Sequence, residues 1–259
     1  MTASRPLLEV RDLTLQIGQR TLIRKLSLTV NTGEVWCVLG ANGVGKTMLF
    51  NTLVGLRSAA SRCIWFCGEP LDHWSARDAA RVRGFLPQTI HDAFSAPVLD
   101  VVLLGRHPHL SRWGWEREVD RERALAALQA VDLADLAERD ITTLSGGERR
   151  RAAIAGLLVQ DAPLLLLDEP ITHLDIHHQI LVLEHLAALA LSQQKAVIFS
   201  IHDLNLAFRF ATHALLFRED GFVEHGPVEE VMNDAALSDA FRHPVAQMHI
   251  GRQTVFVAR

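Results

Sequence analysis

A glycine-rich segment at residues 40–47, which we call the phosphate loop, constrains the possible folds of this chain more than any other stretch. It reads Gly40-Ala41-Asn42-Gly43-Val44-Gly45-Lys46-Thr47 and fits the pattern G-x-x-x-x-G-K-[ST]. An apolar run at residues 35–39 precedes it, and a helical pattern at residues 48–53 follows it. Because strand, glycine loop and helix stand in the order that a phosphate cradle requires, a chance match in a glycine-rich turn is disfavoured.

The chemistry of this segment predicts a nucleotide-phosphate site. Glycines allow backbone N–H groups to surround phosphate oxygens, and the start of the following helix adds the positive end of its dipole. We expect Lys46 to reach the β- and γ-phosphates and the Thr47 hydroxyl to hold Mg²⁺.

Bulk composition is that of a soluble globular protein. With 259 residues the chain can form one large α/β domain, or a core that carries an inserted subdomain. Its formal net charge of −4 gives no general electrostatic reason to bind nucleic acid or anionic lipid. No apolar run approaches the ~20 residues of a membrane-spanning helix, and residues 1–6 lack the apolar core of a secretion signal. We therefore expect that any work at a membrane is done from its surface.

The cysteines are Cys37, Cys63 and Cys67. An odd number without C-x-x-C spacing suits a reducing cytosol, so we expect all of them to pack as apolar residues, and metal binding by the last two is disfavoured. Thirteen histidines include the pairs His107/His109 and His177/His178. Neither pair shows a carboxylate or thiol companion at ligand spacing, so we expect most histidines to lie at the solvated surface.

Strand signals dominate the N-terminal part of the chain. Residues 7–30 alternate between apolar and polar, with Gly18-Gln19 as a turn, which predicts a hairpin with one buried face. The further elements expected here are a short strand at residues 63–66, a polar helix at 76–83 and a brief strand at 84–86 that ends at Pro87-Gln88.

The pattern becomes helical between residues 89 and about 160. Helical stretches at residues 98–104 and 116–131 flank an expected loop at residues 105–115. Trp113 and Trp115 in this loop look exposed, and packing of both onto their own helices is an equally good alternative. Because strand patterns resume afterwards, we interpret this region as a helical insertion rather than a separate domain.

A leucine run bounded by prolines, at residues 163–170, predicts a central parallel strand buried on both faces. The elements expected after it are a helix at residues 176–192, a strand at 196–201, a helix at 204–211, a strand at 213–217, a helix at 234–241 and a hairpin of 245–250 with 254–257.

Two acidic residues, Asp168 and Glu169, close the leucine-rich strand. Phosphoryl transfer to water needs one carboxylate to complete Mg²⁺ coordination and another to orient or deprotonate the attacking water. We assign Asp168 to the metal, through water, and Glu169 as the general base, over the alternative that they merely end a strand. His202, at the end of the next strand, stands where open α/β sheets bind ligands, although a lone histidine there is more often a neighbour of a helix cap.

Residues 144–148, Leu144-Ser145-Gly146-Gly147-Glu148, form what we call the signature segment. Ser145 fits a helix cap, the glycines leave backbone amides uncovered, and Glu148 completes the pattern of a capping box, which predicts a second anion-binding helix start. At this point the sequence closely resembles the ATP-binding cassette (ABC) ATPases. The motifs that carry the resemblance, in order along nearly the whole chain, are the phosphate loop, Gln88, the signature segment, residues 164–169, His173-Leu174-Asp175 and His202.

The resemblance implies an α/β fold of the P-loop NTPase type: a RecA-like core with an N-terminal antiparallel β subdomain and an inserted α-helical subdomain. Residues 1–259 would form a single ABC ATPase domain. Its expected parts are residues 1–88 and 160–232 for the β subdomain and the core, residues 89–159 for the helical subdomain with the signature segment, and residues 233–259 for a short C-terminal extension.

The resemblance also implies a head-to-tail homodimer with two ATP molecules at the interface. Each would lie between the phosphate loop of one subunit and Ser145, Gly146, Gly147 and Glu148 of the other. Gln88 would join the Mg²⁺ ligands and sense the helical insertion, Asp175 would bridge the subunits, and His202 would contact the γ-phosphate. ATP would then add binding energy only to the closed dimer, and hydrolysis would reopen it.

Two positions depart from the family pattern. An aromatic residue, commonly Tyr before Gly, usually stacks on adenine from the N-terminal hairpin, but here that place is Ile17-Gly18 and the chain has no Tyr. We expect Ile17 to contact adenine by apolar packing instead. Ile171, where such proteins often carry Thr, is a milder difference.

A single cassette without membrane spans looks like the separate ATPase subunit of a bacterial importer, at the cytoplasmic face of the inner membrane. Residues 105–110, 172–179 and 202–207 resemble the subgroup that serves iron–siderophore, haem and cobalamin uptake. The resemblance implies a transmembrane permease as partner, with a periplasmic substrate-binding protein indirectly, and we favour cobalamin or ferric siderophore over haem. Coupling to the permease is expected near residues 89–98 and 105–115.

The competing hypothesis is a soluble ABC ATPase that acts on nucleic acid or ribosomes. Its only support is the basic cluster Glu148-Arg149-Arg150-Arg151, for which a solvated or phosphate-facing role is the better explanation. Ribosome-associated members generally carry two cassettes and DNA-repair members carry large insertions, and this chain has neither. We therefore expect no nucleic-acid partner.

Overall fold

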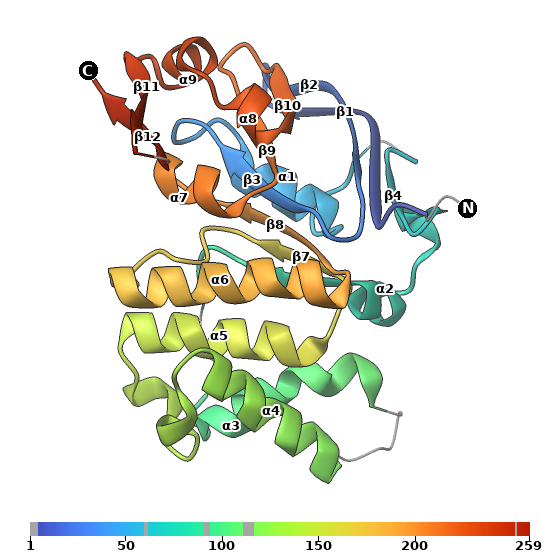
Figure 1. The fold of residues 1–259 in the computed structure, drawn as a ribbon. Helices are drawn as coiled ribbons and strands as arrows, with labels where there is room; N and C mark the ends of the chain where they lie inside the picture. The colour runs from blue at the N-terminus through green and yellow to red at the C-terminus, as the bar shows by residue number, and fades with distance from the viewer. Residues whose placement is uncertain (1–4, 60–61, 91–93, 111–116, 252) are drawn as a thin grey trace.

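The computed structural model describes residues 5–59, 62–90, 94–110, 117–251 and 253–259. Its centre is a six-stranded sheet in the order β10-β9-β3-β8-β7-β6, which lies above the helices α5 and α6 in Figure 1. Every neighbouring pair is parallel except β9 with β10. The strands are β3 (Val35–Leu39), β6 (Arg83–Leu86), β7 (Leu164–Leu167), β8 (Ala196–Ser200), β9 (His213–Phe217) and β10 (Val223–Pro227).

The inner strands are buried on both faces, as their continuous apolar runs predict. In β3, Cys37 and Leu39 contribute to one core, which includes residues of α5 (Gly146–Gln160) and α6 (Ile176–Gln193). Trp36 and Val38 of the same strand contribute to the other core, which contains the N-terminal strands and α1 (Lys46–Leu53). The sheet is thus the middle layer, and it holds the ends of its strands in fixed positions.

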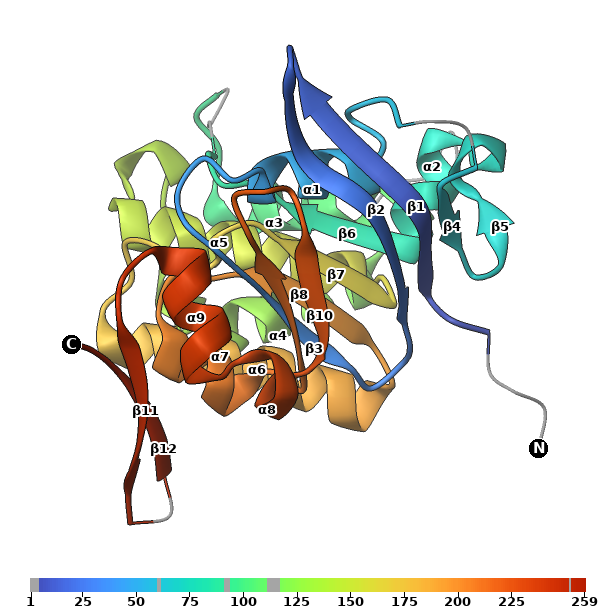
Figure 2. The same ribbon diagram turned by 90° about the horizontal axis from the view of Figure 1, so that it is seen from above.

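A second, four-stranded antiparallel sheet has the order β2-β1-β4-β5. Its strands are β1 (Leu8–Ile17), β2 (Arg20–Val30), β4 (Ile64–Phe66) and β5 (Glu69–Pro70). The predicted hairpin is confirmed, but a bulge at Asp12, with φ of 49°, interrupts its alternation. Ile17 stands two residues after the buried Leu15 and four after the buried Leu13, so strict alternation would bury it on the same face. It is nevertheless 54% exposed, because it lies at the hairpin tip, which projects beyond the sheet in Figure 2.

Helices are the main secondary structure of residues 89–159 where the structure describes them, as predicted. The elements are α3 (Val98–Leu103), the 3₁₀ helix η2 (Leu104–His109), α4 (Glu118–Ala130), the 3₁₀ helices η3 (Ala134–Leu136) and η4 (Ile141–Thr143), and α5. The expected loop at residues 105–115 is wrong in its first half, which continues α3 as η2. Arg106 explains this, because its buried guanidinium donates to Asp120 Oδ1 at 2.9 Å and to the Val159 carbonyl at 3.1 Å. Trp113 and Trp115 lie outside the described residues.

The remaining elements are η1 (Leu71–His73), α2 (Ala76–Val82), α7 (Leu204–Phe210), α8 (Val228–Val231), α9 (Asp234–Phe241), β11 (Val245–Ile250) and β12 (Gln253–Ala258). Among them, α2, α7, α9, β11 and β12 were expected and differ only by small shifts at their ends. The sequence did not predict β10 or α8. The terminal hairpin is attached to α7 by Asn205, which accepts from the Phe256 amide at 2.7 Å and donates to its carbonyl at 3.3 Å.

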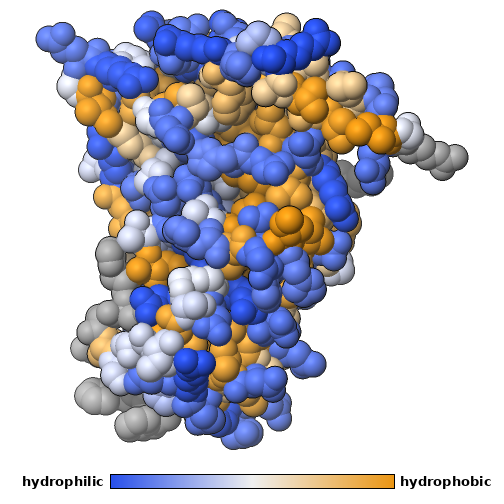
Figure 3. All heavy atoms as spheres, turned by 90° about the vertical axis from the view of Figure 1, so that its left-hand side faces the viewer, coloured by the Kyte–Doolittle hydropathy of each residue, from blue (hydrophilic) through white to orange (hydrophobic). Residues whose placement is uncertain are grey.

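The surface is mixed in character. On the face drawn in Figure 3, apolar patches are separated by hydrophilic residues. Within the described residues, no helix has both the length and the apolar character that crossing a bilayer would demand.

The division of the chain into residues 1–88 with 160–232, 89–159 and 233–259 stays a prediction.

Candidate active site

An open cleft of about 480 Å³ collects most of the residues that the sequence singled out. Its walls are Ile17, Leu22, Asn42, Gly43, Gly45, Lys46, Thr47, Met48, Gln88, Glu169 and His202. They come from the hairpin tip, the phosphate loop, the segment after β6 and the segments that follow β7 and β8. These elements are distant in sequence, and the two sheets bring their ends together.

The phosphate loop adopts a conformation that its glycines permit. Gly45 caps α1 with φ of 116° and no side-chain hydrogen bond, so the first amides of the helix face the cleft without a side-chain cap. Gly40 has φ of 141°, and a Cβ there would lie 2.9 Å from Cβ of Phe217 in β9. The loop can therefore pass close to the sheet only because this position carries no side chain.

Lys46 is the first residue of α1 and is buried, with its ammonium group held against the loop. Its Nζ donates to the carbonyl oxygens of Gly40 at 2.7 Å and Ala41 at 3.2 Å. Burial lowers the pKa of Lys46, whereas the negative charges of Glu169 and Asp168 oppose this shift. The positive charge of Lys46 and the negative charges of Asp168 and Glu169 therefore attract each other.

Asp168 is buried, only 1% exposed, and is followed by Glu169, which lines the cleft. Its Oδ1 accepts from the Ser200 hydroxyl at 2.6 Å, and the same hydroxyl accepts from the Glu169 amide at 2.7 Å. Ser200 is the last residue of β8 and was not predicted as a site residue. The available signal was a small polar residue at the end of an apolar strand, beside the strand that ends in Asp168.

Glu169 has φ of 52°, a left-handed conformation that turns its side chain into the cleft. His202 Nε2 lies 2.9 Å from Oε1, and the Thr172 hydroxyl donates to Oε2 at 3.1 Å. Burial alone would raise the pKa of Glu169, but the hydrogen bond and charge of His202, with hydrogen bonds from Thr172 and Gln88, together lower it. Glu169 is thus held as a carboxylate at the edge of the phosphate loop.

Arg150 was wrongly expected to be solvated or to face phosphate. It is 5% exposed, and its hydrogen bonds among the described residues all go to backbone carbonyls near the cleft. The acceptors are Pro87 at 2.6 Å, Gln88 at 3.2 Å, Asp168 at 2.5 Å, Glu169 at 2.8 Å and Pro170 at 3.3 Å. Burial lowers the pKa of Arg150 to about 10, against the charges of Asp168 and Glu169. Arg150 thereby connects α5, the helix that begins in the signature segment, to Gln88 and to residues 168–169.

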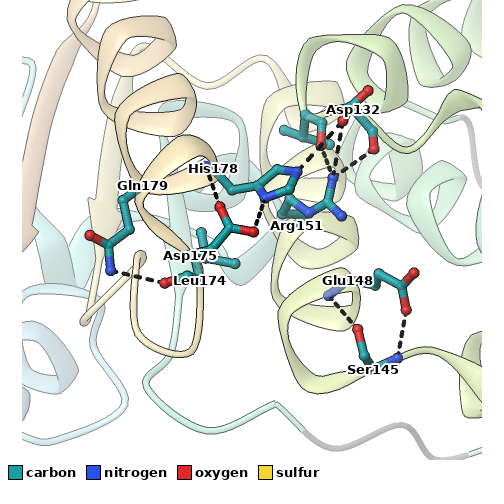
Figure 4. Close-up of polar contacts among 9 residues, drawn as sticks. Asp132, Ser145, Glu148, Arg151, Leu174, Asp175, His178 and Gln179 are labelled. Atoms are coloured by element: carbon teal, nitrogen blue, oxygen red, sulfur yellow. Dashed lines mark hydrogen bonds and ion pairs between the residues drawn. The ribbon is translucent and has the colours of Figure 1, made fainter.

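The signature segment forms the capping box that the sequence predicts. At the start of α5 the Ser145 amide donates to Glu148 Oε2 at 2.7 Å, and the Glu148 amide donates to the Ser145 hydroxyl at 3.3 Å (Figure 4). A Cβ on Gly146 would meet nothing within 4 Å, so this side of the helix start is open. The signature segment does not line the cleft.

Asp175 also lies away from the cleft and caps α6. Its side chain accepts from the His178 amide at 2.9 Å, and its Oδ2 lies 2.8 Å from His178 Nδ1. The expectation that the pair His177/His178 has no carboxylate companion is therefore wrong, and Asp132 of the helical region lies close as well. Asp175, three residues before His178, was a signal that the sequence offered, whereas Asp132 is distant along the chain and could not be recognised from it. His109 is likewise held, with its Nε2 lying 2.8 Å from the Gln160 carbonyl.

A substitution tests how much the hydrogen bonds of Arg150 contribute to the stability of the fold. Arg150→Lys should lower the free energy of unfolding by about 2–4 kcal/mol, because one ammonium group cannot reach all of these carbonyls and leaves some of them buried and unpaired. The measurement is urea denaturation followed by circular dichroism. Arg121→Lys, at an exposed ion pair with Glu138, is the matched control and should change stability by less than about 0.5 kcal/mol. Equal stability of the two variants would contradict a structural role for Arg150.

Comparison with known proteins agrees with this geometry. The model of the family described as "ABC transporter" matches residues 23–172, more than half of the chain. Over 235 residues the chain is 37% identical to the ferric enterobactin transport ATP-binding protein FepC of Escherichia coli (strain K12), covering 90% of this chain and 86% of FepC. It is 39% identical over 241 residues to the hemin import ATP-binding protein HmuV of Myxococcus xanthus (strain DK1622), covering 90% and 89%.

Among solved structures, the fold is similar to a chain described as a metal-chelate type ABC transporter in an inward-facing conformation. The TM-score is 0.84 with 30% sequence identity, and the match covers 98% of each chain. The P-loop NTPase fold expected from the motifs is therefore confirmed. Since the family model matches residues 23–172 and the relatives and the similar structure cover 90% or more of the chain, this chain belongs to the ABC transporter family.

Proposed function

We propose that the chain is the ATP-hydrolysing subunit of a bacterial importer, and that it energises uptake of a metal chelate through a separate transmembrane permease. As a family member the chain binds ATP and hydrolyses it in support of transport. The observation that carries the proposal is that one cleft contains the phosphate loop, Gln88, Glu169 and His202. The class of cargo is supported by the names of two relatives, a ferric enterobactin transport ATP-binding protein and a hemin import ATP-binding protein.

The residues around Asp168 fit a Mg²⁺ ion. Among the described residues, Asp168 Oδ2 is buried and has no hydrogen-bond partner, although Oδ1 is held by Ser200. A buried carboxylate oxygen of this kind suits a hard cation, either directly or through a bound water. Thr47, Gln88 and Asp168 would hold the ion, which when bound neutralises developing charge on the β- and γ-phosphates.

Glu169 is the proposed general base. Its carboxylate faces the cleft and is ionised, so it can accept a proton from the water that attacks the γ-phosphorus. Thr172 and His202 each hold one of its oxygens, which fixes the carboxylate in place. The imidazole of His202 also lines the cleft, and we assign it to the γ-phosphate. Lys46 and the open amides at the start of α1 bind the remaining phosphate charge.

The active form is a homodimer of head-to-tail subunits. In a single chain the cleft is open and the signature segment lies outside it, so ATP bound to the phosphate loop keeps one exposed side. The open helix start at Gly146 offers backbone amides to an anion on another copy. Asp175, whose carboxylate is 66% exposed, is placed to reach across the same interface. ATP therefore stabilises only the closed pair.

The permease and its periplasmic binding protein determine the individual chelate, because the ATPase does not touch the cargo. We place the chain at the cytoplasmic face of the inner membrane, as a peripheral subunit. Residues 89–98 and 105–115 are the proposed contact with the permease, and within them η2 packs against α5. Residues 91–93 and 111–115 lie outside the described residues.

A role on nucleic acid loses two of the three arginines in its one supporting feature. Arg150 is engaged by carbonyls near the cleft, and Arg151 is 8% exposed and donates to the carbonyls of Val131 and Asp132. Neither guanidinium is available to phosphates of a nucleic acid. Binding of DNA or RNA that weakens steeply with salt would revive this alternative.

The decisive variant is Glu169→Gln. It should keep ATP binding, accumulate as an ATP-bound dimer and lose about 10²-fold or more in turnover, because the amide keeps the shape of the carboxylate but cannot accept the proton. Phosphate release measures turnover, and light scattering after size exclusion with Mg-ATP measures the dimer. Glu184→Gln, at an exposed ion pair, is the control. Hydrolysis near the wild-type rate would mean that another group is the base.

The hairpin tip offers a second test. Ile17→Tyr should tighten ATP binding about two- to tenfold, because a stacked aromatic ring adds roughly 0.5–1.5 kcal/mol beyond its area. Calorimetry with the Glu169→Gln background avoids turnover. Ile250→Tyr, at an exposed position of the terminal hairpin, controls for added aromatic surface. Unchanged affinity would show that Ile17 does not contact adenine.

The class of cargo is tested in the reconstituted complex with the permease and binding protein. A metal chelate should stimulate ATP hydrolysis, and ferric siderophore, cobalamin and haem are to be compared at equal concentration. The metal-free siderophore is the matched control. Stimulation by none of the chelates, with intact ATP hydrolysis, would refute the importer assignment while leaving the ATPase site in place.

A further inference from the structure

A cluster of side chains away from the cleft combines ligands from two regions. Asp132 follows α4 in the helical region, whereas His177 and His178 lie in the first turn of α6. One ligand atom from each lies within 4.8 Å of the others. The rings of His177 and His178 are arranged edge to face, with centroids 5.1 Å apart. Imidazole nitrogens and a carboxylate oxygen so close together form the ligand set of a transition-metal site.

The hydrogen bond to Asp175 orients His178 for this purpose. His178 Nδ1 lies 2.8 Å from Asp175 Oδ2, so in the neutral ring Nδ1 carries the proton and Nε2 presents its lone pair. Among the described residues, Nε2 is buried without a hydrogen-bond partner, and it points toward Asp132 Oδ2 at 3.5 Å (Figure 4). A carboxylate that fixes one nitrogen of a histidine while the other faces outward is the usual environment of a metal-binding imidazole.

The separations suit a small ion. Zinc binds imidazole nitrogen and carboxylate oxygen at about 2.0–2.2 Å in tetrahedral geometry, which places neighbouring ligand atoms roughly 3.3 Å apart. The 3.5 Å between His178 Nε2 and Asp132 Oδ2 is close to this value. His177 is exposed, so its ring can turn to supply the third ligand. Calcium and magnesium are disfavoured because they require more oxygen ligands than this cluster provides.

Arg151 is a competing cation, but its hydrogen bonds leave the Asp132 carboxylate available. Its Nη1 donates to the carbonyls of Val131 at 2.8 Å and Asp132 at 2.6 Å, whereas Asp132 Oδ2 lies 4.0 Å away. Arg151 therefore anchors the backbone of Asp132. The carboxylate itself is 71% exposed and can move toward an ion.

We infer that Asp132, His177 and His178 form a binding site for a borderline divalent transition-metal ion such as Zn²⁺, with water completing the coordination. The ion joins the helical region to the start of α6, directly beside Asp175. This site is separate from the Mg²⁺ position proposed in the cleft, and it does not depend on the class of cargo.

Zinc binding to the full-length, nucleotide-free protein tests the inference. Calorimetry with Zn²⁺ alone, in the presence of a thiol-free reductant, should show one strong site that weakens at least tenfold in both His177→Ala and Asp132→Ala. The exposed His243→Ala is the matched control and should bind as the wild type does. Thermal unfolding without metal checks that each variant folds. Zinc should also raise the melting temperature of the wild type and of His243→Ala, but not that of His177→Ala.

Cobalt replaces zinc for the spectroscopic readout. Co²⁺ should give a visible absorption spectrum of four-coordinate nitrogen and oxygen ligands that is lost in His177→Ala and kept in His202→Ala, which alters the cleft. Three results would overturn the inference: equal Zn²⁺ affinity in His177→Ala, Asp132→Ala and the wild type; loss of the strong site in His202→Ala; or a thiolate band from Cys63 or Cys67.

Discussion

The parallel pairing of β3, β8 and β7 determines where the chemistry of this chain takes place. Val38 pairs with Ser200, and Leu167 pairs with Phe199, so these strands end at the same edge of the sheet. The phosphate loop leaves β3 there, Asp168 leaves β7 and His202 follows β8. A shift in register between these strands would separate phosphate-binding amides from the proposed base. The two apolar cores that fix the sheet from both sides are therefore also what holds the active site together.

Sequence reasoning succeeded where the signal was local. Apolar runs predicted the buried strands, and the capping box at Ser145 was visible from its spacing alone. It failed where a partner is distant along the chain. Nothing in a run of arginines shows that Arg150 lies under strand ends whose carbonyls need donors, and His178 meets Asp132 only after α4 and α6 have packed. The edge strand β10 was missed because its short, polar segment has no apolar run.

The electrostatics of the cleft reflect a balance between burial and pairing. Burial by itself would make Glu169 harder to ionise, but His202 and Thr172 hold the charged form and keep its pKa low. A base with a low pKa is a weak proton acceptor, which suits a site that should stay inactive until the substrate is fully enclosed. Since the signature segment lies outside the cleft, the proposed mechanism requires a second copy of the chain to enclose the nucleotide.

Arg150 connects the helical region to two of the proposed catalytic residues, Gln88 and Glu169. Its guanidinium is planar and rigid, and it binds the carbonyl of Gln88 on one side and that of Glu169 on the other. Any displacement of α5 relative to the sheet must therefore either carry both segments along or break buried, charge-assisted hydrogen bonds, which cost more than neutral ones. The signature segment stands at the start of the same helix. If the signature segment contacts nucleotide bound to a partner subunit, a resulting shift of α5 would reach its own subunit's proposed metal ligand and base together. Arg150 would transmit that shift, because its side chain binds the carbonyls of both Gln88 and Glu169.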